Sequence, residues 1–210
     1  MPATVHKDRY SVESRIRELG LRRAGLISAV RAAAAAVASC TVNHPPTARG
    51  WLAWCDAVVR LREEFRSDGW TADDTANFST IVDEAAGIRI AVVNTDEGAG
   101  NAALVPTNRS RRGEFSRKAI EDNQLSLPFE GWGVEPPDAK KEGVTTWYLC
   151  IHVVGEMVRA ELSLPTSCES GIIGGWKERI MLVSSDDDLI FGGGPLVDDG
   201  PDFEVKIARK

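Results

Sequence analysis

The fold class is decided by residues 144–164, which read VTTWYLCIHVVGEMVRAELSL. Polar and apolar residues alternate on both sides of Gly155-Glu156, and a two-residue turn there pairs Val154 with Met157. This register puts two apolar sets on one face of a hairpin, as burial of that face requires. The sets are Trp147, Leu149, Ile151 and Val153 on one strand, and Val158, Ala160, Leu162 and Leu164 on the other. We expect the opposite face to be solvated, with Tyr148, Cys150, His152, Arg159, Glu161 and Ser163 on it.

Four further segments have the alternation and composition of strands. Two of them, Phe78–Asp83 and Ile88–Val93, are joined by the short hairpin loop Glu84–Gly87. The others are Ile173–Val183 and Phe203–Ile207.

The N-terminal third has helical periodicity instead. Ser11 can cap a short helix that carries Val12, Ile16 and Leu19. A second helix carries apolar residues from Leu26 to Val37, and Asn43-His44-Pro45-Pro46 breaks it.

A third helix, from Thr47 to Arg66, has the clearest pattern of the three. We expect its apolar stripe to be core; the stripe consists of Trp51, Trp54, Cys55, Val58, Leu61 and Phe65. The connection between the second and third helices is longer than the turn of a DNA-binding helix-turn-helix.

These segments predict an α+β fold in which N-terminal helices pack on a mainly antiparallel β-sheet. Residues 1–69 form the helical region, and residues 70–210 form an antiparallel β region with a long irregular loop at 94–143. The two regions either form separate units or one continuous domain. A loop of that length inside a compact domain is usually functional or disordered.

Composition points to an intracellular, cytoplasmic protein without metal or cofactor. The longest apolar run, Ala32–Ala38, is too short to cross a membrane, and the polar N-terminus lacks an apolar signal region. The cysteines and histidines lack zinc-site spacing, and no C-x-x-C pair is present. The formal net charge of −6 argues against a general nucleic-acid coat.

The irregular loop contains the peptide Gln124-Leu125-Ser126-Leu127-Pro128-Phe129. It resembles the short Q-L-x-L-x-F motif by which many bacterial replication and repair proteins bind the β sliding clamp. Gln124, Leu125, Leu127 and Phe129 occupy the four defining positions. The resemblance covers six residues and implies nothing about the fold. It implies that the amide of Gln124 hydrogen-bonds at one end of a cleft while Leu127 and Phe129 enter an apolar pocket.

A basic run lies just upstream of this peptide. A clamp encircles duplex DNA, so these side chains are candidates for phosphate contacts beside the ring. A solvated loop is the alternative for the same residues, which are Arg109, Arg111, Arg112, Arg117 and Lys118.

The only catalytic pattern is weak. Glu204-Val205-Lys206 has the E-x-K form of many nucleases, and Asp188, Asp199 or Asp202 could supply a second carboxylate for a metal ion. No phosphate-binding loop, dinucleotide fingerprint or nucleophile elbow is present.

The sequence therefore favours a non-enzymatic interaction protein of a bacterial cell, or of a phage or mobile element living in one. Its expected partner is the sliding clamp, as a replication or repair accessory factor or as an inhibitor. The alternatives are a metal-dependent nuclease, and an unrelated protein-binding module in which the Gln124–Phe129 peptide is buried.

Overall fold

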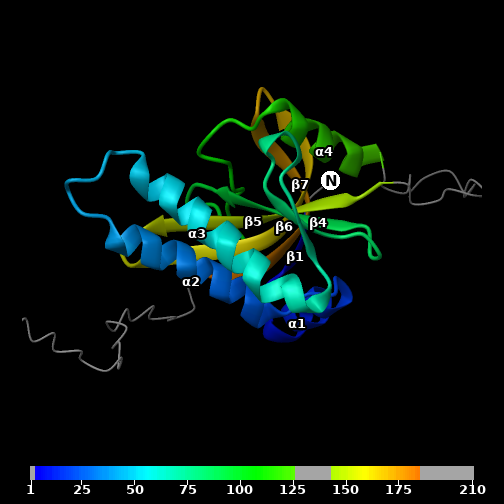
Figure 1. Ribbon diagram of the computed structural model, residues 1–210. Helices are drawn as coiled ribbons and strands as arrows, with labels where there is room; N and C mark the ends of the chain where they lie inside the picture. Colours follow the sequence, from blue (N-terminus) through cyan, green and yellow to red (C-terminus); the bar gives the residue numbers. More distant parts are fainter. Residues whose placement is uncertain (1–2, 126–142, 185–210) are drawn as a thin grey trace, which may run out of the picture.

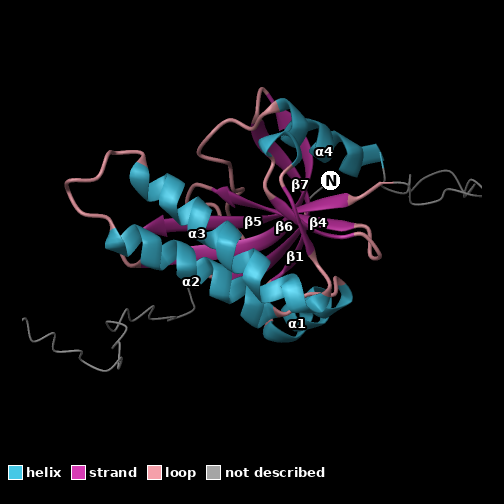
Figure 2. Ribbon diagram, viewed as in Figure 1, coloured by secondary structure: helices cyan, strands magenta, loops and turns pink. Residues whose placement is uncertain are grey.

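The protein folds around one mixed β-sheet with helices on both faces (Figures 1 and 2). The structure, a computed structural model, describes residues 3–125 and 143–184. Within these ranges the sheet has seven strands in the order β1-β7-β6-β5-β4-β3-β2. The strands are β1 (Thr4–His6), β2 (Thr71–Asp73), β3 (Thr80–Asp83), β4 (Ile88–Asn94), β5 (Thr145–Val154), β6 (Met157–Glu169) and β7 (Ile172–Val183).

Most neighbouring strands are antiparallel, which confirms the predicted class of sheet. The exceptions are the pairs β4–β5 and β1–β7, which are parallel. Because β4 and β5 are parallel, the chain between them must cross a face of the sheet. The predicted strand at Phe203–Ile207 lies outside the described residues.

The β5–β6 hairpin has the predicted register. Val154 pairs with Met157, Ile151 with Ala160, and Leu149 with Leu162. The apolar face of the hairpin is buried in a core shared with the N-terminal helices. Alternation and the two-residue turn were therefore sufficient to predict this pairing.

The N-terminal helices pack on that face, as predicted (Figure 1). They are α1 (Arg9–Glu18), α2 (Arg23–Ser39) and α3 (Ala48–Phe65), and the break between α2 and α3 includes both prolines. Gly25 lets α2 approach α3 closely, since a Cβ there would lie 2.9 Å from the Phe65 ring. The helical and β regions thus share one hydrophobic core.

The predicted cap of α1 was wrong by three residues. Asp8 is the N-cap, and its Oδ1 accepts a hydrogen bond of 2.9 Å from the backbone N–H of Ser11. Aspartate and serine are both good caps, so residue preference alone did not distinguish them.

The expectation of a solvated second face of the hairpin was also wrong. Tyr148, Cys150, Glu161 and Ser163 are fully buried. The chain between β4 and β5 covers this face, first as an irregular segment and then as α4 (Glu114–Leu125). A second core forms there, and its larger members are Phe78, Ile120, Tyr148, Ile173 and Trp176.

None of the helices within residues 3–125 and 143–184 combines the length and hydrophobicity needed to cross a membrane.

We call the irregular residues 95–113, between β4 and α4, the covering segment. Gly100 offers a direct test of how tightly this segment packs on the sheet. Its φ is +66°, and an added Cβ would lie 2.2 Å from the Val183 carbonyl oxygen. Gly155 has a similar φ of +60°, but no heavy atom beyond its chain neighbours lies within 4 Å of an added Cβ. It is therefore a matched control. We expect Gly155→Ala to cost about 1–2 kcal/mol from backbone strain alone. Gly100→Ala should cost about 1–3 kcal/mol more, because overpacking is added.

Urea unfolding of the two variants measures this difference. Equal losses of stability would mean that the chain around Gly100 moves away from the sheet without resistance.

Candidate functional site

A buried ion pair lies at the centre of the face covered by the β4–β5 connection. Glu161 on β6 and Arg179 on β7 are 0% and 3% exposed. The carboxylate accepts two hydrogen bonds from the guanidinium, of 2.6 and 2.8 Å. It also accepts bonds from the Ser163 hydroxyl and the Gly100 backbone N–H. These four bonds replace the hydration that the buried carboxylate lacks.

Arg179 ties this pair to the covering segment. Its guanidinium donates hydrogen bonds to the carbonyl oxygens of Gly98, Asn101 and Leu104, at 2.7–3.1 Å. These carbonyls lie in a segment without helix or strand, and two of them, those of Gly98 and Asn101, also accept 3.2 Å hydrogen bonds from backbone N–H groups of the same segment. The polar cluster therefore serves packing, and its lack of solvent exposure argues against a role as an active site.

The other polar groups on this face have structural partners too. Burial raises the pKa of Tyr148 to about 12, so its phenol stays protonated and shares a 2.5 Å hydrogen bond with Ser116. His152 lies 3.1 Å from the carbonyl oxygen of Thr95. The sequence places His152, Glu161 and Arg159 on one face of the hairpin. In the structure His152 and Arg159 bond to backbone carbonyls, while Glu161 bonds to Arg179, Ser163 and Gly100.

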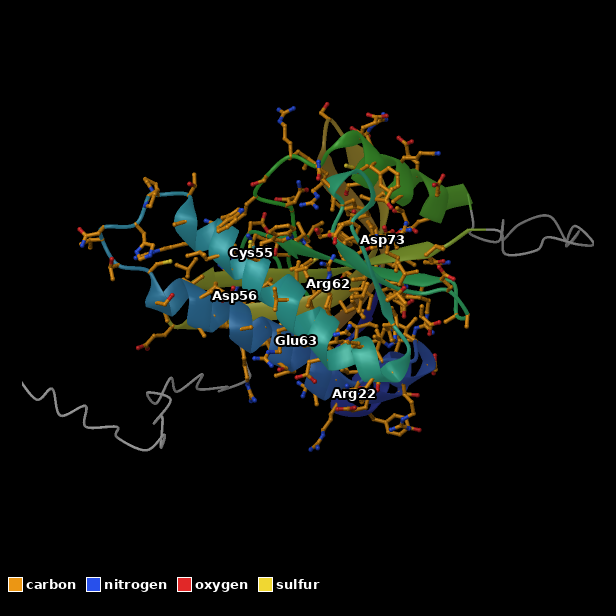
Figure 3. All side chains as sticks on the ribbon, viewed as in Figure 1. Arg22, Cys55, Asp56, Arg62, Glu63 and Asp73 are labelled. Atoms are coloured by element: carbon orange, nitrogen blue, oxygen red, sulfur yellow. The ribbon has the colours of Figure 1, made fainter. Side chains whose placement is uncertain are left out.

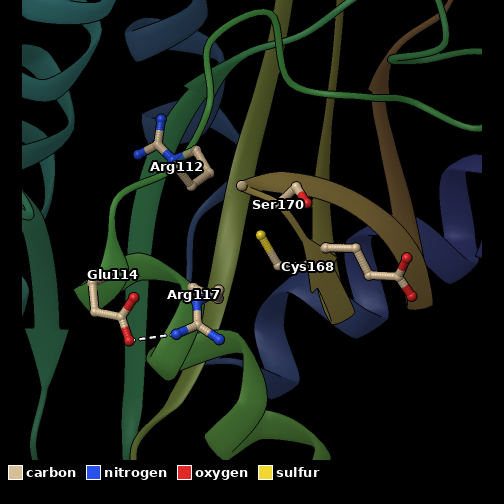
Figure 4. Close-up of a pocket in the computed structure, with 7 residues that line it drawn as sticks. Arg112, Glu114, Arg117, Cys168 and Ser170 are labelled. Carbon is tan, nitrogen blue, oxygen red and sulfur yellow. Dashed lines mark hydrogen bonds and ion pairs between the residues drawn. The ribbon is translucent and has the colours of Figure 1, made fainter.

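A shallow hollow beside α4 contains Cys168 (Figure 4). Two arginines face it, but Arg117 is paired with Glu114 and Glu121. Burial raises the pKa of the Cys168 thiol, although Arg112 opposes the shift. The thiol is therefore not activated for nucleophilic attack.

A larger groove of about 720 Å³ opens where α3 begins and β4 and β5 end. We call it the Trp51 groove. The lining residues that matter most are Arg49, Trp51 and Trp54 of α3, Asn94 of β4, and Arg109 and Arg112 of the covering segment. Ile151 and Val153 of β5 supply an apolar floor.

Trp51 corrects the prediction that the stripe of α3 is core along its whole length. Val58, Leu61 and Phe65 are buried, whereas Trp51 is 62% exposed. The N-terminal end of α3 lies beside the end of β4, and its side chains Arg49, Trp51 and Trp54 line the groove. The acidic side chains of α3 lie elsewhere, because Asp56 and Glu63 project into solvent (Figure 3).

The predicted DNA-contact residues are separated by the structure. Arg109 and Arg112 line the Trp51 groove. Arg111 is exposed and donates a hydrogen bond to the Ser170 carbonyl oxygen. Arg117 is held by its two carboxylates, and Lys118 is exposed on α4.

This basic segment is fixed to the sheet by its own backbone. The Arg109 N–H donates to the Asn94 carbonyl oxygen at 3.0 Å, and the Arg112 N–H donates to Gly171 at 2.8 Å. Between them, the buried Asn108 amide donates to the carbonyls of Ser110 and Gly171. The residues from 108 to 112 therefore form a rigid wall of the groove.

The predicted docking peptide begins at the end of α4. Gln124 and Leu125 are the last helical residues, while Leu127 and Phe129 lie outside the described residues. The residue before the peptide, Asn123, is 1% exposed. Its side chain exchanges two hydrogen bonds with the backbone of Thr146, of 2.7 and 2.8 Å.

The residues of the nuclease hypothesis, Asp188, Asp199, Asp202, Glu204 and Lys206, also lie outside the described residues. In the part of the chain that is described, no three His, Cys, Asp or Glu side chains converge in a way that could hold a metal ion.

Sequence reasoning missed the Trp51 groove. Its available signals were the two tryptophans at a spacing of three and the basic run, which lie more than fifty positions apart. Only the packing of α3 against the end of β4 brings them together.

No protein-family model, no curated protein and no solved structure matches this chain.

The contribution of the Glu161–Arg179 pair to the stability of the fold can be tested. Arg179→Met would leave the Glu161 carboxylate buried without its cation, and we expect a loss of about 3–5 kcal/mol in unfolding free energy. The amides of residues 97–105 should also exchange faster with deuterium, because their carbonyl anchors are gone. Arg117→Met is the control, since its ion pairs are exposed and contribute little.

Urea unfolding and hydrogen–deuterium exchange give the two readouts. A loss no larger than that of Arg117→Met would show that the covering segment is held by other contacts.

Proposed function

We propose that this chain is a non-enzymatic interaction protein that docks on the bacterial β sliding clamp through Gln124–Phe129. The observation that carries the proposal is the match of Gln124, Leu125, Leu127 and Phe129 to the four defining positions of the clamp-binding motif. Pro128 lies between Leu127 and Phe129, the two side chains expected to enter the pocket. It restricts one backbone dihedral, which lowers the conformational entropy that the peptide loses on binding.

The hydrogen bonds of Asn123 support a role for this peptide as a tethered element. Asn123 near the end of α4 and Thr146 at the start of β5 are paired directly, so the chain that carries the motif begins and ends at one point of the fold. A third bond, from Asn123 to the Pro165 carbonyl oxygen, anchors the same point to β6. A partner that binds the peptide therefore acts on a segment attached to a rigid base.

Docking requires a small adjustment of α4. Gln124 and Leu125 are in its last turn, where carbonyl groups lack helical partners. Helix ends open at little free-energy cost compared with the body of a fold. The buried Asn123 then limits unwinding to the residues of the motif.

Within this proposal the protein acts in the bacterial cytoplasm, where the clamp encircles DNA. It either recruits an activity to the clamp or occupies the cleft and excludes polymerases. The two roles use the same contact and differ in their effect on DNA synthesis.

Binding of the full chain to immobilised β clamp tests the proposal. Gln124→Ala combined with Phe129→Ala should weaken binding by at least about 30-fold, the equivalent of one anchor worth ~2 kcal/mol. Ser126→Ala is the matched control, because it changes the variable position of the same peptide. It should bind like the parent chain.

Thermal unfolding of each variant checks that the fold is retained. The proposal fails if the parent chain does not bind the clamp, or if the double variant binds as tightly as the parent.

A primer-extension assay with clamp and polymerase distinguishes the two roles. An inhibitor should reduce processive synthesis in proportion to clamp occupancy, and the double variant should not. An accessory factor should leave processive synthesis unchanged at the same occupancy.

A further inference from the structure

The charges that line the Trp51 groove all have one sign. Arg49, Arg109 and Arg112 contribute to it, and none of the Asp and Glu residues within 3–125 and 143–184 lines it. Neither Arg49 nor Arg109 takes part in an ion pair among the described residues. A groove of positive charge in a protein of net charge −6 attracts an anion against the overall field.

The groove also offers flat aromatic surface. Trp51 and Trp54 are three residues apart on α3 and therefore lie on the same side of the helix. Trp54 is half-buried against the core, whereas Trp51 presents most of its indole to solvent. An exposed tryptophan next to guanidinium groups provides a face on which another ring can stack.

One residue holds both walls of the groove in place. The Asn94 side-chain amide donates a 2.6 Å hydrogen bond to the Gly50 carbonyl oxygen, in the first turn of α3. The Asn94 backbone carbonyl accepts the N–H of Arg109. The tryptophans and the basic segment are thus positioned before any ligand arrives, which lowers the ordering cost of binding.

We propose that the Trp51 groove binds a nucleotide unit whose base is unpaired. The base stacks on Trp51, and its phosphate is bound by Arg109 with support from Arg49. Guanidinium groups match phosphate geometry, and stacking on an aromatic side chain accepts any base. The groove residues are distinct from Gln124–Phe129, so a failure of clamp docking would not contradict nucleotide binding, nor the reverse.

The exposed position of Trp51 favours an unpaired base over duplex DNA. Bases in a duplex are already stacked on each other, and exposing one costs a few kcal/mol. A single strand presents its bases without that cost. A free nucleotide has the same chemistry, so the experiment must separate these two sources.

Fluorescence anisotropy of a labelled single-stranded thymidine oligomer tests the proposal on the full chain at low salt. Trp51→Ala should weaken binding roughly tenfold through loss of one stacked base. Trp51→Phe should restore much of the affinity, because an aromatic face is regained. Arg109→Ala should lower the slope of log affinity against log salt by about 0.7, the value for one phosphate of a single strand.

Two surface variants serve as controls. Tyr10→Ala removes an 84% exposed aromatic side chain from α1, and Arg60→Ala removes an exposed arginine from α3 outside the groove. Both should bind like the parent chain, as should the Gln124→Ala/Phe129→Ala variant. Circular dichroism confirms that each variant folds.

Competition identifies the source of the nucleotide. If unlabelled single strand displaces the probe and thymidine monophosphate does so only at far higher concentration, the ligand is a nucleic-acid strand. If the monophosphate competes equally well per site, the ligand is a free nucleotide.

Three outcomes would overturn the proposal. One is no binding of either probe at low salt. Another is binding that Trp51→Ala and Arg109→Ala leave unchanged. The third is equal competition by duplex DNA or by a glutamate-rich peptide, which would show selection of charge without stacking.

Discussion

Glu161 and Arg179 are the charged pair on which the layered arrangement depends. Moving two ions out of water costs several kcal/mol for each, and only additional hydrogen bonds make such a pair tolerable. Those bonds come from Ser163 and from the irregular segment that contains Gly98, Gly100, Asn101 and Leu104. The pair therefore converts a stretch without regular structure into a fixed layer on the sheet. The basic wall of the Trp51 groove and the start of α4 come next along the same chain, between β4 and β5.

The parts that could be predicted from sequence are those specified by local patterns. Alternation and a two-residue turn set the register of β5 and β6 because both signals lie within 21 consecutive residues, 144–164. A break between α2 and α3 was predicted from Asn43–Pro46 in the same local way, because proline cannot continue a helix, although α2 already ends at Ser39. These features need no information about what packs against them.

The features that were missed depend on partners distant in the chain. A polar face such as that of Cys150, Glu161 and Ser163 has the same sequence pattern whether water or another segment covers it. Here the cover is a loop that supplies its own carbonyls to Arg179. Likewise, the exposure of Trp51 results from α3 continuing past the edge of its core, which no periodicity within the helix reveals.

The pairing of Asn123 with Thr146 has an evolutionary consequence. It closes the chain between them at its base, so changes of length within that stretch need not disturb the sheet. Loop-closure entropy grows slowly, by about 0.6 kcal/mol for each doubling of length. Related proteins could therefore differ in the length and sequence of this connection while keeping the same body. An asparagine that bridges the end of a helix to the start of a strand would mark the connection.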